Sequence, residues 1–186
     1  MALPKEKKYT AEEFLAFAET NSEPMELIDG EIVYLASPSI IHQRIIGSIH
    51  FEIMNYIKSN KGDCIPMLSP FDVRLQDDNV VVPDISVICD KSKLSDGKRC
   101  NGSPDWIIEV VSSNWKDDYI RKLHLYEENG VREYWIVDPQ RRKTVVYFFE
   151  DNNNIINIYD FSQSIPVNIY KNNPVQLSIN IDELLK

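Results

Sequence analysis

The 186-residue chain lacks the features that mark several classes of protein. It has only three cysteines and three histidines, and these form no CxxC pair and no Cys–His spacing typical of a zinc site. No apolar run approaches the roughly 18 residues that a membrane span needs, and the amino-terminal lysines precede no signal-peptide core. We therefore expect reduced thiols in a cytoplasmic protein without a membrane segment.

Excess positive charge and the common catalytic motifs are also missing. Lysine and arginine number 20 against 29 aspartates and glutamates, which gives a formal net charge of −9. This balance disfavours a broad basic surface for nucleic acid, although a local site can differ from the summed charge. The sequence contains no Gly-rich phosphate loop, no GxSxG and no HExxH.

What remains is the composition of a globular protein, with 43% apolar and 26% charged residues. Because no repeat or linker interrupts it, we expect a single domain over 1–186, with a core at about 9–149 and a strand extension at 150–186. Thr10 and Glu13 form a capping-box pattern at the start of a first helix. Asp29-Gly30, between two apolar runs, predicts a hairpin.

Hydrophobic periodicity places the remaining elements. A long helix is expected from Ser37-Pro38 to Gly62, and a third helix at 114–129. Extended segments are expected at 70–75, 80–89, 105–111, 133–137 and 143–149. This order indicates an α/β fold, bordering on α+β, with helices packed on the faces of a sheet.

Two carboxylates interrupt apolar strands. Asp84 lies within the run 80–88, where it is either functional or a strand end that meets solvent. Glu109 lies within 106–111, which is apolar on both faces and so resembles a buried central strand. An unpaired buried carboxylate costs roughly several kcal/mol, so a metal, a lysine or a raised pKa should compensate. The alternative for Glu109 is a structural ion pair.

Lys122 lies at the edge of the apolar stripe of the third helix, at 114–129. Asp118, Lys122 and Tyr126 follow at i, i+4 steps, and the plain alternative is an ordinary Asp–Lys helix pair. Two carboxylates on neighbouring strands with one lysine are, however, the groups that metal-assisted phosphodiester cleavage requires. The carboxylates would hold Mg²⁺, and the lysine would orient a water or neutralise charge on the phosphate.

Several stretches in chain order resemble the Uma-two family of endonucleases, within the restriction-endonuclease-like PD-(D/E)xK superfamily. The resemblance runs from about residue 9 to residue 149. It is carried by residues 26–31, 37–42, 83–87, 108–112, 118–126 and 133–138. It implies a restriction-endonuclease-like fold, which is a central mixed sheet with helices on both sides, here with an amino-terminal helix and hairpin and extra carboxyl-terminal strands.

The resemblance also implies roles for particular residues. Asp84 matches the metal-binding Asp of the superfamily, and Glu109 matches the Glu of its second half-motif. The usual lysine two residues later is replaced by Val111, and Lys122 matches the lysine that some members supply from the following helix. Tyr126 would help to hold Lys122, with Asp118 as a further supporting residue.

Two further positions match the family. Glu26 corresponds to an early acidic position and could be another metal ligand, or else an exposed strand residue beside the hairpin. His42 corresponds to a recurring histidine, although a histidine on an apolar helix stripe is more often a satisfied core residue.

We therefore expect a cytoplasmic bacterial endonuclease that depends on Mg²⁺ or Mn²⁺ and acts on DNA. A homodimer is compatible with this, since each domain carries one site. One alternative is an inactive binding or regulatory module, or a mobile-element remnant. A third is a hydrolase of another phosphorylated or glycosidic substrate. Asp84→Ala or Lys122→Ala is expected to abolish cleavage with the fold intact.

Overall fold

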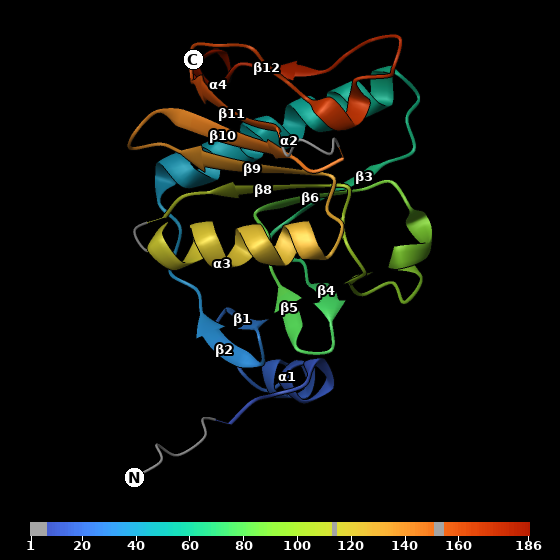
Figure 1. Cartoon of the computed structure of the whole chain (residues 1–186), viewed down its shortest axis with the longest axis vertical. Helices are drawn as coiled ribbons and strands as arrows, with labels where there is room; N and C mark the ends of the chain where they lie inside the picture. The colour runs from blue at the N-terminus through green and yellow to red at the C-terminus, as the bar shows by residue number, and fades with distance from the viewer. Residues whose placement is uncertain (1–6, 113–114, 151–154) are drawn as a thin grey trace.

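A six-stranded mixed sheet forms the centre of the molecule (Figure 1). The computed structural model describes residues 7–112, 115–150 and 155–186. The strand order is β11-β10-β9-β8-β6-β3, in which β8 and β9 are parallel and the other neighbours antiparallel. The strands are β3 (Ile65–Leu68), β6 (Ile85–Ile88), β8 (Trp106–Val110), β9 (Glu133–Asp138), β10 (Lys143–Phe148) and β11 (Ile155–Asp160). The expected α/β fold with a central mixed sheet is confirmed.

Helices cover both faces of this sheet. Helix α2 (Ile40–Ser59) lies on one face and α3 (Trp115–Glu128) crosses the other (Figure 1). Side chains of β8 alternate between them: Trp106, Ile108 and Val110 join the core of α2, whereas Ile107 joins that of α3. The same alternation directs Glu109 towards α3. In the described ranges, no helix has the length and apolar character to cross a bilayer.

A second sheet, in the order β2-β1-β5-β4-β7, packs beside α1 (Ala11–Ala18). Its strands are β1 (Met25–Ile28), β2 (Glu31–Tyr34), β4 (Val73–Gln76), β5 (Asn79–Val81) and β7 (Cys100–Asn101). The capping box of Thr10 and Glu13 is confirmed. The hairpin is confirmed as well, with φ of 52° at Asp29 and 76° at Gly30, since a two-residue turn of this kind needs positive φ at both positions.

The segment 80–89, expected as one strand, is divided between the two sheets. Residues 80 and 81 are the last two of β5, and β6 begins at Ile85. Val82, Pro83 and Asp84 connect the two strands and belong to neither. Proline has no N–H to continue a ladder, so the chain leaves one sheet at Pro83 and enters the other. Strand β3 was not expected, and α2 begins at Ile40 rather than at Ser37 because the Ser39 side chain caps it by accepting the N–H of His42.

The carboxyl-terminal segment packs on the same face of the sheet as α2. Beyond β11 it contains β12 (Ile165–Pro166), the 3₁₀ turn η2 (Asn168–Tyr170), β13 (Ser178–Ile179) and the short helix α4 (Ile181–Leu184). A second 3₁₀ turn, η1 (Lys91–Leu94), lies in the loop before β7. The expected strand extension is therefore one sheet strand followed by a small two-stranded sheet and a helix.

Two of the three cysteines form a disulfide, so the expectation of reduced thiols is wrong for Cys64 and Cys89. The antiparallel register of β3 and β6 pairs Ile65 with Ile88. The next residues outward, Cys64 and Cys89, therefore lie opposite each other, with Cα atoms 3.9 Å apart. Cys100 is a buried free thiol.

Candidate active site

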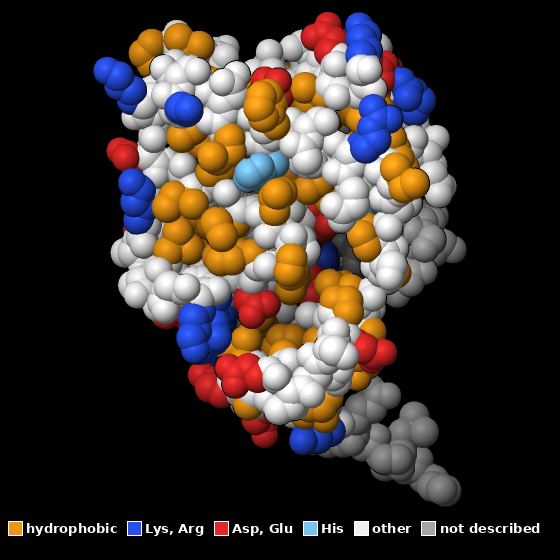
Figure 2. All heavy atoms as spheres, turned by 180° about the vertical axis from the view of Figure 1, so that it is seen from behind, with side chains coloured by type: hydrophobic (Ala, Val, Ile, Leu, Met, Phe, Trp, Pro, Cys, Tyr) orange, Lys and Arg blue, Asp and Glu red, His pale blue; other side chains and the backbone are white. Residues whose placement is uncertain are grey.

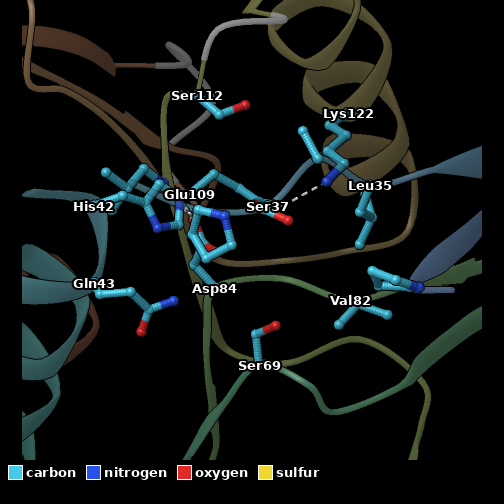
Figure 3. Close-up of a pocket in the computed structure, with 14 residues that line it drawn as sticks. Leu35, Ser37, His42, Gln43, Ser69, Val82, Asp84, Glu109, Ser112 and Lys122 are labelled. Carbon is cyan, nitrogen blue, oxygen red and sulfur yellow. Dashed lines mark hydrogen bonds and ion pairs between the residues drawn. The ribbon is translucent and has the colours of Figure 1, made fainter. Parts of the chain in front are cut away.

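A cavity of about 210 Å³ opens at the junction of the two sheets and the first turn of α2 (Figure 3). Asp84, Glu109 and Lys122 line it, together with His42. These residues come from the segment before β6, from β8, from α3 and from α2, so the cavity brings together parts of the chain that are up to 80 positions apart.

Asp84 and Glu109 are neighbours across two antiparallel strands. Ile85 of β6 pairs with Ile108 of β8, so Asp84 lies opposite Glu109 one step beyond that pair. Asp84 Oδ2 accepts a hydrogen bond of 2.7 Å from the backbone N–H of Val110. The two carboxylate side chains are 15% and 14% exposed, so they are recessed but reachable from the cavity.

The ammonium group of Lys122 lies between two carboxylates. Its Nζ is 2.9 Å from Glu109 Oε1 and 3.0 Å from Glu26 Oε1, and the side chain is only 5% exposed. Tyr126, one helical turn further, donates its hydroxyl to Glu109 Oε1 at 2.8 Å. Tyr126 thus contacts the same carboxylate as Lys122, where the sequence had suggested that it would hold Lys122 itself.

The electrostatics of this cluster are dominated by burial and by excess negative charge. Burial raises the pKa of the Glu109 carboxyl, the charge of Lys122 opposes that rise, and the charges of Asp84 and Glu26 add to it. Burial and the charge of Glu109 also raise the pKa of the Tyr126 hydroxyl. Three carboxylates therefore lie close together, and the ammonium group of Lys122 contacts two of them, an arrangement that favours a further cation.

Glu26 is buried behind Lys122 and does not line the cavity. Its Oε1 accepts the N–H of Val82 at 2.7 Å in addition to the contact with Lys122. Its Oε2 is buried and has no hydrogen-bond partner among the described residues. Glu26 is therefore not an exposed strand residue, and its carboxylate forms an ion pair with Lys122.

His42 lies in the first turn of α2, where its ring reaches Asp84. Nε2 is 3.2 Å from Asp84 Oδ2, while Nδ1 is buried without a described hydrogen-bond partner. Burial lowers the pKa of His42, but the hydrogen bond and charge of Asp84 outweigh it and the net pKa is raised. His42 is therefore part of the cluster. The side chain of Asp118 lies outside the described residues.

The carboxylates that face the cavity suit a hard divalent cation. Asp84 makes its side-chain contacts through Oδ2 and Glu109 through Oε1, so each retains one oxygen without a described hydrogen bond. In the described part of the chain, no group of three or more His, Cys, Asp or Glu side chains is arranged to hold a metal ion by itself. Mg²⁺ commonly binds to one or two carboxylates and completes its shell with water and substrate phosphate, so the pair fits that ion.

Sequence reasoning did not single out Gln43 and Ser69, which also line the cavity. Gln43 lies in α2, and Ser69 follows β3, a strand that the sequence did not predict. Neither residue breaks a local pattern, so only the assembled fold identifies them.

Comparison with known proteins gives consistent matches. Residues 11–169 match the Uma2 family, described as "Putative restriction endonuclease". The chain is 28% identical over 144 residues to the uncharacterized protein sll1609 of Synechocystis, covering 74% of this chain and 79% of that protein.

A solved structure has a similar fold. It is the crystal structure of a protein from Anabaena variabilis that is described as "a putative nuclease belonging to DUF820". The TM-score is 0.73 at 24% identity, with 94% of this chain and 96% of that chain covered. The expected restriction-endonuclease-like fold and the family resemblance are both confirmed. Since the family match spans most of its length, this chain belongs to the Uma2 family of restriction-endonuclease-like proteins.

Proposed function

We propose that this protein is a metal-dependent endonuclease that hydrolyses phosphodiester bonds of DNA. The observation that carries the proposal is the convergence of Asp84, Glu109 and Lys122 at one cavity, in a chain of a nuclease family. Burying an acid pair and an ammonium group costs folding free energy. Charged groups that are buried in spite of this cost are typical of catalytic sites.

The acid pair would hold Mg²⁺ or Mn²⁺ through the oxygens that the protein does not use. When bound, such a cation would supply positive charge for the scissile phosphate and for an attacking water. His42 and the N–H of Val110 fix Asp84 Oδ2, and Tyr126 and Lys122 fix Glu109 Oε1. These four contacts orient the two carboxylates before substrate arrives.

Lys122 would neutralise charge that develops on the phosphate, or hold the attacking water. Glu26 accepts a hydrogen bond from its ammonium group on the side away from the cavity. We therefore propose that Glu26 acts by positioning Lys122, a role that the geometry favours over the sequence-based prediction of a third metal ligand, which stays untested.

The test is cleavage of DNA by the purified protein with Mg²⁺, with Mn²⁺ and with EDTA. We expect cleavage with either metal and none with EDTA. Asp84→Asn and Glu109→Gln should each lower the rate by roughly 10³-fold or more, because each removes a charge from the reacting centre. Glu128→Gln, an exposed carboxylate on α3, is the matched control and should leave the rate unchanged.

Other outcomes would favour the alternatives. Binding of DNA without cleavage under all metals would favour a binding or regulatory module. Hydrolysis of a different phosphorylated or glycosidic substrate, with DNA untouched, would favour the third reading. Equal rates for wild type and Asp84→Asn would contradict the proposed site.

A further inference from the structure

The cavity carries polar side chains that the proposed mechanism does not use. Ser37, Gln43, Ser69 and Ser112 line it around the acid pair (Figure 3). Their side chains make no hydrogen bond with any residue that the structure describes. Each is an uncharged group that can donate a hydrogen bond to a phosphate oxygen or to the edge of a base.

Positive charge is scarce at the same place. Lys122 is the single lysine or arginine among the described lining residues, and two carboxylates already hold it. Figure 2 shows a hollow in the lower half of this face, with red and blue atoms in its depth and mainly orange and white atoms around it. Proteins that grip duplex DNA do so largely through lysine and arginine contacts to phosphates, which this cavity does not offer.

The remaining wall of the cavity is apolar, and the cavity is small. Pro24, Leu35, Ala36, Pro38 and Val82 contribute apolar side chains to a volume of about 210 Å³. A stiff double helix cannot enter a space of this size, and the recessed carboxylates lie below its rim. An unpaired strand can enter, because its bases are free to pack against apolar surface.

We propose that this cavity binds DNA as an unpaired single strand. Gln43 and the neighbouring serines hydrogen-bond to the strand, and the wall that contains Leu35 packs against its bases. The inference rests on the proposed function and narrows its substrate from DNA in general to single-stranded DNA.

The experiment compares binding of a labelled single strand of about 12 nucleotides with its duplex, by fluorescence anisotropy. The Asp84→Asn protein in Mg²⁺ is used so that binding is read without cleavage, and wild type in EDTA serves if that variant does not fold. We expect the single strand to bind at least tenfold more tightly than the duplex. Its affinity should fall by less than about tenfold between about 50 and 200 mM salt, as expected for one or two phosphate contacts.

Variants of the wall locate the binding site. Gln43→Ala and Leu35→Ala should each weaken binding of the single strand by roughly fivefold. Phe51→Ala is the matched control, since Phe51 is a 65% exposed apolar side chain of α2 that does not line this cavity. It should leave binding unchanged.

Binding of DNA tests the preference for a single strand, whereas cleavage tests the proposed function. The inference would be overturned if the duplex bound as tightly as the single strand or more tightly. It would also be overturned if the affinity for the single strand fell by 10³-fold or more over the same range of salt, or if both wall variants bound it as wild type does. No binding of either DNA would overturn it too. Preferential binding of the single strand without any cleavage in Mg²⁺ would support the inference and count against the proposed function alone.

Discussion

At the scale of single residues, the ammonium group of Lys122 is the positive charge of a buried ion-pair network. It is buried between Glu26 and Glu109, and both carboxylates depend on it. Removing one partner of a buried ion pair leaves the other charge uncompensated, which typically costs about 3–5 kcal/mol. The sequence-based expectation that Lys122→Ala keeps the fold intact is therefore revised.

We predict that Lys122→Met lowers the free energy of unfolding by about 3 kcal/mol or more, measured by urea denaturation. The double variant Lys122→Met with Glu26→Gln removes one of the stranded charges as well, and should recover part of that loss without recovering cleavage. If Lys122→Met alone were as stable as wild type, the three groups could not form the buried network described above.

The sequence predicts some of these residues and not others for a physical reason. Asp84 and Glu109 interrupt apolar runs, and a charge in such a run requires an explanation. Glu26 lies 96 positions from Lys122, in a hairpin whose own pattern is ordinary, so its burial against the lysine follows only from how the two sheets meet.

At the scale of elements, Glu133 fastens the carboxyl-terminal segment to the central sheet. This fully buried carboxylate of β9 accepts hydrogen bonds from the Trp135 ring, from the Asn168 amide and from the N–H of Ile169 in η2. Burial raises the pKa of Glu133 from its ordinary 4.5 to about 7, although these hydrogen bonds oppose the rise.

This shift predicts a dependence of stability on pH. Between 4.5 and about 7 the folded protein keeps a proton on Glu133 that the unfolded chain has lost, so stability from this group falls as pH rises through that window. The loss is up to about 3 kcal/mol for a shift of this size. The free energy of unfolding of Glu133→Gln, measured by urea denaturation, should therefore depend less on pH than that of wild type between about pH 5 and pH 8.

The exposed variant Glu128→Gln should show the wild-type dependence on pH. Identical pH profiles for Glu133→Gln and wild type would contradict the assignment.

The disulfide joins β3 to β6, the strand that follows Asp84. It closes a loop of 25 positions, for which chain entropy alone predicts about 3.5 kcal/mol of stabilisation. A thiol reductant should therefore lower the melting temperature of wild type. The double variant Cys64→Ala with Cys89→Ala should melt at a lower temperature and not respond to the reductant; a response of that variant would show that the reductant acts elsewhere.

The elements themselves were predicted unequally. Strong local signals, such as the capping box at Thr10 and the Asp29-Gly30 turn, gave the right structures. The run 80–88 did not, because its apolar pattern continues through Pro83 while the backbone changes sheets there. Strand β3 is short and contains Pro66, so its composition gives little strand signal.

At the scale of the whole molecule, the net charge is negative and the cavity is acidic, so both repel the phosphates of DNA. A formal charge of −9 opposes non-specific binding of DNA, so substrate must reach the site through local contacts and through a bound cation. The single-domain boundary, the cytoplasmic location and the homodimer stay predictions. Sedimentation of the purified protein would test the last of these.

The most direct test of the central claim is a crystal structure of the protein with Mn²⁺, in which anomalous scattering locates the metal. We predict a peak in the cavity at roughly 2.1 Å from one oxygen each of Asp84 and Glu109, with Lys122 still between Glu109 and Glu26. Anomalous peaks only on the surface, with both carboxylates unliganded at saturating metal, would contradict it.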